Sequence, residues 1–185
     1  MTAVRRPNRG PRAAAENRAA LITAAREAFA TAGYNAPLTE VARAAGVGQG
    51  SLYRHFPDRV SLALAVFEDS VADLEALAAR PGTTLDDVLN LITEQTVAST
   101  AFITMVSVPP RPDPRIVEVR DRVARVLESV LPEARRTGRV RPDITADDLV
   151  LAVGMVAVLL SNLPASERTE TTGRMWRLLR HGIEA

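Results

Sequence analysis

The sequence lacks several of the residues on which enzyme and metal sites depend. Its 185 residues include no cysteine and only two histidines. Without cysteine there can be no disulfide, thiolate metal site or cysteine nucleophile. His55 and His181 stand in neither of the spacings H-x-x-x-H and E-x-x-H that bind zinc on helices, and no glycine-rich phosphate loop is present. We therefore expect no catalytic residue, no metal and no cofactor.

Long apolar runs are also missing. The stretch from Leu149 to Ser166 is uncharged over 18 residues, whereas a membrane span needs about 20 mostly apolar residues. It contains Gly154, Ser161 and the helix-ending Pro164, so we expect a buried helix and no membrane partner. Charged residues interrupt the alanines near the N-terminus, which argues against a signal peptide.

Charge of both signs is present but unevenly placed. The formal net charge is only +1, and all 23 basic residues are arginine. Up to Arg59, nine arginines accompany four acids, whereas 14 arginines and 18 acids follow. The first segment has a net charge of +5 and the second −4. This pattern is typical of a protein whose N-terminal part displaces counterions from nucleic acid. Residues 1–13 hold four arginines and no acid, and form either an arm on DNA or a solubilising tail.

Residues 37–56 have the pattern of a helix-turn-helix motif. Thr39 is a good N-cap for a first helix, because its hydroxyl can accept a hydrogen bond from an otherwise unpaired amide. Gly46 can end that helix, since glycine adopts positive φ readily. Gly48 can then precede a second helix that runs to about Phe56.

The second helix of this motif has an apolar side and a polar side. Leu52 and Phe56 lie four residues apart and are expected to face the core. The other positions provide donors, acceptors and one aromatic ring but no carboxylate, which would repel phosphate. The alternative is a solvated polar face without a nucleic-acid partner. The outward positions are Gln49, Gly50, Ser51, Tyr53, Arg54 and His55.

At these residues the chain resembles the DNA-binding domain of the TetR family of bacterial transcriptional regulators. The run TEVARAAGV is followed after two residues by GSLYRHFPDR and preceded by a helix ending in FATAGY, and the resemblance covers about residues 14–70. It implies that the second helix reads DNA. Gly48 stands where serine is common, and Arg59 where lysine is more common. The DNA-binding residues implied are Thr39, Gln49, Gly50, Ser51, Tyr53, Arg54, His55 and Arg59.

The same resemblance implies a regulator of transcription, most simply a repressor. Such a protein binds a palindromic double-stranded DNA operator as a homodimer and is released by a small-molecule ligand. It is cytoplasmic and associated with the nucleoid when bound to DNA. The alternatives are an all-α DNA-architectural protein without a ligand and, least favoured, an all-α enzyme.

Helical patterns continue through the rest of the chain. We expect an all-α fold with an arm and a three-helix DNA-binding domain at 1–60, and a ligand-binding and dimerisation domain of about six helices at 61–185. Asp58, Asp113 and Thr145 are expected N-caps, and Thr84 begins a further helix. The expected long helices cover about 14–32, 59–79, 84–99, 113–137, 145–163 and 166–182, with a short one before residue 108.

An uncharged stretch in the body predicts a ligand pocket. The run from Gln95 to Val108 has no charged residue, so we expect it inside the body. Because the polar groups nearby are uncharged, a small apolar or weakly polar ligand is expected. The alternative is that these residues only fill the core. The candidates are Phe67, Asn90, Thr93, Thr96, Thr100, Phe102 and Met105.

The last two helices are expected to form a dimer interface. The first is apolar on all sides and the second has one apolar face, so two chains that pair these helices would cover more apolar surface than one chain can. In the family that the chain resembles, this pairing is a four-helix bundle. The alternative is an ordinary core within one chain. The expected interface residues are Val153, Val156, Leu160, Met175, Trp176 and Leu179.

Overall fold

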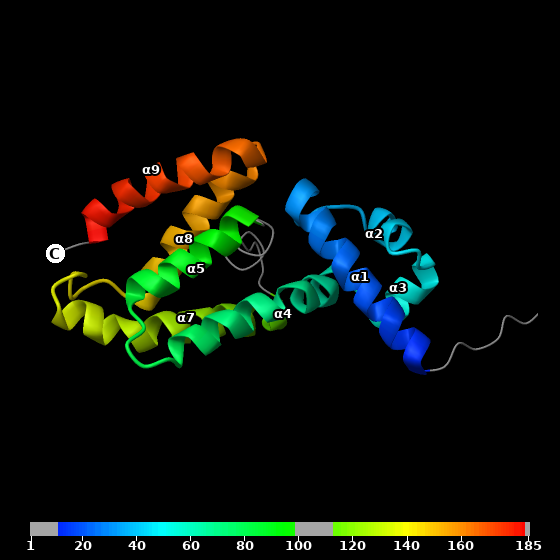
Figure 1. Cartoon of the computed structure of the whole chain (residues 1–185), viewed down its shortest axis with the longest axis horizontal. Coiled ribbons are helices and arrows are strands. Elements are labelled where there is room, and N and C mark those ends of the chain that lie inside the picture. Colours follow the sequence, from blue (N-terminus) through cyan, green and yellow to red (C-terminus); the bar gives the residue numbers. More distant parts are fainter. Residues whose placement is uncertain (1–10, 99–112, 184–185) are drawn as a thin grey trace, which may run out of the picture.

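The computed structural model describes residues 11–98 and 113–183, and every regular element in these ranges is a helix. The all-α prediction is confirmed (Figure 1). The expected short helix before residue 108 falls partly at 99–112, outside the described residues. The eight helices of the described ranges are α1 (Pro11–Ala32), α2 (Leu38–Ala44), α3 (Gln49–His55), α4 (Arg59–Ala78), α5 (Leu85–Ala98), α7 (Pro114–Arg136), α8 (Ala146–Ser161) and α9 (Ala165–Ile183).

The helices form a small head and a larger body. Helices α1, α2 and α3 lie together at one end of the molecule, and α5, α7, α8 and α9 form the other end (Figure 1). The head closes around side chains that are at most 2% exposed, among them Leu21, Phe29, Val41, Leu52 and Phe56. The three-helix head that the sequence predicts is therefore confirmed.

Helix α4 joins the head to the body. It packs against α1 of the head and against α5 and α7 of the body. Asp58 is its N-cap, as predicted: the carboxylate accepts a hydrogen bond of 2.7 Å from the Ser61 amide, and the Ser61 hydroxyl lies 3.3 Å from the Asp58 amide. The domain boundary expected at residue 60 lies in the first turn of this helix.

Two arginines of α7 hold that helix against α4. Arg115 donates to Asp58 at 2.8 Å and to Asp113, the N-cap of α7, at the same distance. Arg122 reaches Glu68 at 3.0 Å and Glu75 at 2.8 Å. The hydrogen bonds from Arg115 lower the pKa of Asp113 to about 2 and, together with the Ser61 amide, lower the pKa of Asp58. Helix α7 is thus fixed to α4 beside the head and again further along.

Two helix starts differ from the sequence prediction. Helix α1 begins at Pro11, so the last three residues of the predicted arm are helical. Proline is tolerated in a first turn, and Arg12 pairs with Glu16 one turn later at 3.2 Å. Helix α2 begins at Leu38 after Pro37, and no side chain caps it. The assignment of Thr39 as the N-cap was wrong, because Thr39 already lies in the first turn.

None of the helices in residues 11–98 and 113–183 is long and apolar enough to cross a membrane. The uncharged stretch that was compared with a membrane span lies largely in helix α8, which ends at Ser161. Eight of its 16 residues are buried, so it contributes a large part of the body's core.

Acid should weaken the contact between α4 and α7. The lowered pKa values of Asp58 and Asp113 mean that both carboxylates stabilise the fold above about pH 4, the ordinary pKa of aspartate. This contribution is lost as the pH falls through the lowered pKa values, about 2 in the case of Asp113. In Arg115→Ala the free energy of unfolding, measured with urea, should depend less on pH between about 5 and 2.5. Arg120→Ala, which breaks an exposed pair with Asp147, is the control. Parallel pH profiles for wild type and Arg115→Ala would contradict this account.

Candidate nucleic-acid interface and body cavities

The turn between α2 and α3 is built as the sequence predicts. Gly46 has a φ of +65°, a conformation that an L side chain rarely adopts. The amide of Val47 then donates to the carbonyl of Ala42 at 2.9 Å, and the Val47 side chain is buried. Gly48 follows as the N-cap of α3, without a side-chain hydrogen bond. This turn fixes the direction in which α3 leaves the head.

Helix α3 presents its polar side to solvent. Leu52 and Phe56 are 1% and 2% exposed and anchor the helix to the head, as predicted. Tyr53 is 51% exposed. Gln49, Gly50 and Arg54 are also exposed, and Ser51 and His55 are half-buried. The six outward residues named from the sequence therefore do lie together on the accessible sides of one short helix that contains no acidic residue.

Arg59 has a structural contact that the sequence did not predict. Its Nη1 donates to the carbonyl oxygens of Tyr34 and Ala36, at 2.7 and 2.6 Å, and the guanidinium lies 5.8 Å from the centre of the Tyr34 ring. The side chain therefore ties the loop between α1 and α2 to the start of α4. Arg54 makes fewer contacts, since its Nε donates only to the Gly50 carbonyl of its own helix, at 3.1 Å. A DNA contact by Arg59 stays a prediction.

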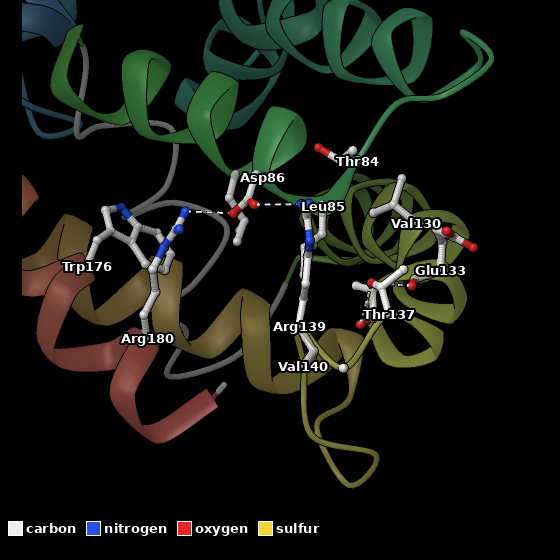
Figure 2. Close-up of a pocket in the computed structure, with 13 residues that line it drawn as sticks. Thr84, Leu85, Asp86, Val130, Glu133, Thr137, Arg139, Val140, Trp176 and Arg180 are labelled. Carbon is white, nitrogen blue, oxygen red and sulfur yellow. Dashed lines mark hydrogen bonds and ion pairs between the residues drawn. The ribbon is translucent and has the colours of Figure 1, made fainter. Parts of the chain in front are cut away.

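Among the described residues, both α5 and α9 line two hollows of the body. One, of about 450 Å³, lies among the start of α5, the end of α7, the loop after it and α9 (Figure 2). The other, of about 620 Å³, lies between α5 and α9. Leu89, Trp176 and Arg180 line both. The two hollows are therefore neighbours along the seam between α5 and α9.

The predicted ligand residues do not line one pocket. Asn90 and Thr93 line the hollow between α5 and α9. Phe67 instead lines a smaller hollow of about 230 Å³ toward α1, and its ring lies 6.2 Å from that of Phe29. Thr96 is buried and donates to the Ile92 carbonyl at 2.7 Å. Phe67 and Thr96 therefore do not line the hollow that Asn90 and Thr93 share, and their part in ligand binding stays a prediction. Thr100, Phe102 and Met105 lie outside the described residues.

Charged side chains that the sequence gave no reason to group meet at the mouth of the 450 Å³ hollow. The carboxylate of Asp86 is 2.8 Å from Nη2 of Arg180 and 3.4 Å from Nη1 of Arg139. Figure 2 shows it between the two guanidinium groups. The three residues come from α5, α9 and the loop after α7, so no local spacing could predict the cluster.

Comparison with known proteins decides the family. The model described as bacterial regulatory proteins of the TetR family matches residues 21–66. A second, described as the C-terminal domain of SbtR-like transcriptional regulators, matches residues 80–185, more than half of the chain. The chain belongs to the TetR family. The DNA-binding head and the helical body that the sequence predicts are both those of a TetR-family regulator, and the identification as a transcriptional regulator is confirmed.

Individual TetR-family relatives agree with this assignment. CprB from Streptomyces coelicolor A3(2) superposes with a TM-score of 0.67 at 26% identity, over 93% of this chain and 90% of CprB. Another TetR regulator from Streptomyces coelicolor gives 0.55 at 27% identity, over 90% and 98%. The transcriptional activator FasR of Mycolicibacterium smegmatis is 44% identical over 71 residues, which span 38% of this chain and only 32% of FasR.

The last two helices of this TetR-family body expose an apolar stripe. Val153, Val156 and Leu160 of the predicted interface are at most 6% exposed within one chain. Naming these three as interface residues was therefore wrong, because they face the chain's own core. Met175, Trp176 and Leu179 are half-buried, and Trp176 packs against the core. The large apolar side chains that do reach the surface of α8 and α9 are Leu151, Met155, Val158, Leu159 and Leu178.

Removing the Arg59 side chain should destabilise the head of this TetR-family protein. Arg59→Ala leaves the carbonyls of Tyr34 and Ala36 without their donor, and hydrogen bonds to charged groups contribute about 1.5–3 kcal/mol each. Because Arg59 is only half-buried, we expect a loss of about 1–2 kcal/mol in the free energy of unfolding. Arg54→Ala, on the exposed side of α3, should cost less than about 0.5 kcal/mol. Equal losses in the two variants would contradict the structural role of Arg59.

Proposed function

We propose that this TetR-family regulator represses transcription as a homodimer that occupies a palindromic operator and leaves it when a small molecule binds the body. The observation that carries the proposal is the accessible, carboxylate-free side of α3, which two buried anchors hold on a rigid three-helix head. Localisation in the bacterial cytoplasm, and on the nucleoid when DNA is bound, is part of the same proposal.

Each subunit places α3 in a major groove. A helix fits this groove, where an amide can pair with adenine and a guanidinium with guanine or phosphate. Gln49 stands at the N-terminal end of α3, the end that helix-turn-helix proteins direct at base edges. Tyr53, Arg54 and His55 then supply groups for phosphate and further base contacts. CprB, which shares 26% identity with this chain, has been solved in complex with its operator, and that finding supports this use of the head.

The apolar stripe of α8 and α9 supplies the dimer contact. Leu151, Met155, Val158 and Leu159 recur at the spacing of one helix face, and each is at least 41% exposed in a single chain. Leu178 of α9 is 77% exposed. Pairing these helices with those of a second copy removes apolar surface from water. It also yields two α3 helices that can meet half-sites about 34–36 Å apart.

The hollows of the body supply the effector site. Their volumes of about 450 and 620 Å³ lie in the range of small-molecule pockets. A γ-butyrolactone receptor superposes with a TM-score of 0.59 at 25% identity over 94% of this chain. We propose repression because a protein that occupies an operator can block transcription without any further contact. FasR is named an activator, but the similarity to it covers only 71 residues.

Substituting Gln49 should change base preference. Gln49→Ala removes an amide that can pair with a base edge, so operator binding should weaken by about 1–3 kcal/mol and preference at one base pair per half-site should relax. Arg54→Ala should instead weaken binding on all sequences and reduce the salt slope of log affinity by about one unit per subunit. Gel shifts on operator and scrambled duplexes at several salt concentrations measure both effects.

The matched control for these variants is Arg136→Ala, at the far end of α7, which removes an exposed arginine paired with Glu133. It should bind DNA as wild type does. Unchanged DNA binding in both Gln49→Ala and Arg54→Ala would show that α3 is not the reading helix.

Neighbouring substitutions on α8 should separate assembly from folding. Met155 is 48% exposed and Val156 only 2%. Met155→Arg should therefore leave each chain folded but reduce the native mass to that of one chain at micromolar concentration. Val156→Arg should lower the melting temperature strongly, because it buries an unpaired charge. Light scattering and thermal unfolding measure the two effects, and a Met155→Arg protein that stays dimeric would contradict the assigned interface.

A further inference from the structure

The mouth of the 450 Å³ hollow holds two positive charges and one shared negative charge. Asp86 is the only carboxylate that the structure pairs with Arg139 or Arg180 among the described residues. The other acidic residue of the lining, Glu133, already pairs with Arg136 at 2.6 Å. Arg139 also attracts the nearby carboxylates of Asp87 and Glu133 without pairing with them. Arg139 and Arg180 thus share one direct carboxylate partner, and each guanidinium group can form paired hydrogen bonds with another carboxylate.

Below this charged mouth, apolar side chains form much of the lining of the hollow. Leu85, Leu89, Val130, Ala134 and Val140 line it, and each is at most 7% exposed. Figure 2 shows the polar side chains of Thr84, Glu133 and Thr137 on one side of the hollow and Trp176 on the other. A ligand that fills this space must therefore combine a charged end with an apolar part.

Trp176 connects the two hollows of the body. Its indole lines both of them, together with Leu89 and Arg180. The Nε1–H of this indole is buried and has no acceptor in the part of the chain that the structure describes. Buried donors are nearly always paired, so this group is suited to a ligand oxygen. The seam between α5 and α9 can thus take an elongated molecule whose polar end lies near Arg180.

We propose that this seam binds an amphipathic monocarboxylate. The carboxylate of the ligand lies on Arg180 and Arg139 in competition with Asp86 and accepts from the Nε1–H of Trp176, and its alkyl chain lies along Leu89 and the indole ring into the second hollow. This differs from the small apolar or weakly polar ligand expected from the uncharged sequence stretch. The role of the ligand as an effector of DNA release rests on the proposed function, whereas its binding does not.

The sequence provides its own reporter for this site. Trp176 is the only tryptophan of the chain, so its fluorescence reports a ligand in either hollow. The full-length protein is titrated without DNA with decanoate and with decanol, which match in chain length and differ in charge. Decanoate should bind at least about tenfold more tightly, the contribution of a charge-assisted hydrogen bond. Calorimetry on the same pair confirms the affinities.

Two variants and one control test where the carboxylate of the ligand binds. Arg180→Gln should abolish the preference for decanoate over decanol. Asp86→Asn removes the internal competitor and should strengthen decanoate binding, a gain that partial unfolding cannot produce. Arg141→Gln is the matched control, because this exposed arginine pairs with Asp143 and does not line either hollow. It should keep the preference of the wild type.

The proposal would be overturned if the wild type bound decanoate and decanol equally well, or bound neither. It would also be overturned if Arg180→Gln kept the preference for decanoate, or if Asp86→Asn bound decanoate more weakly. Because the titration contains no DNA, such a result would leave the proposed repressor function standing. A protein that binds decanoate as expected but binds no specific DNA would overturn that function and leave the ligand site intact.

Discussion

The carboxylate of Asp58 is the contact on which the arrangement of head and body depends. It caps α4, the helix that both parts share, and it accepts a hydrogen bond from Arg115 of α7. The next residue, Arg59, holds the loop between α1 and α2. Two consecutive residues therefore join the head, the linking helix and a helix that lines the hollow of the body. A shift of α7 along α4 would act directly on this contact, which lies at the junction with the head.

The head and the body differ in how their charged side chains are arranged. The head exposes donors and a positive net charge, and its α3 carries no carboxylate. In the body, by contrast, arginines are largely matched by acids: Arg122 by Glu68 and Glu75, and Arg120 by Asp147. The body therefore gives little attraction for nucleic acid, in keeping with α3 as the proposed DNA contact. At the hollow beside Asp86, two guanidinium groups share one carboxylate, and this is the basis on which an anionic ligand is proposed there.

Local sequence signals predicted most of the fold. The turn at Gly46 and Gly48, the inward pair Leu52 and Phe56, and the caps at Asp58, Asp113 and Thr145 all depend on residues within one or two helical turns. Contacts between distant segments were not predictable in this way. Val156 and Met155 are neighbours in an apolar run, and only the packing of α8 on α5 and α7 decides which of them is buried. Arg59, Asp86 and Arg180 find partners that are far away in sequence, which no periodicity reveals.

The central claim is that two copies of α3 read one symmetric DNA site. Selection of bound duplexes from a random pool by the purified full-length protein, followed by sequencing, tests it most directly. The account predicts convergence on an inverted repeat whose half-sites have their centres about one helical turn, 34–36 Å, apart or a multiple of this. Convergence on a single asymmetric motif, or no enrichment of any sequence, would contradict it.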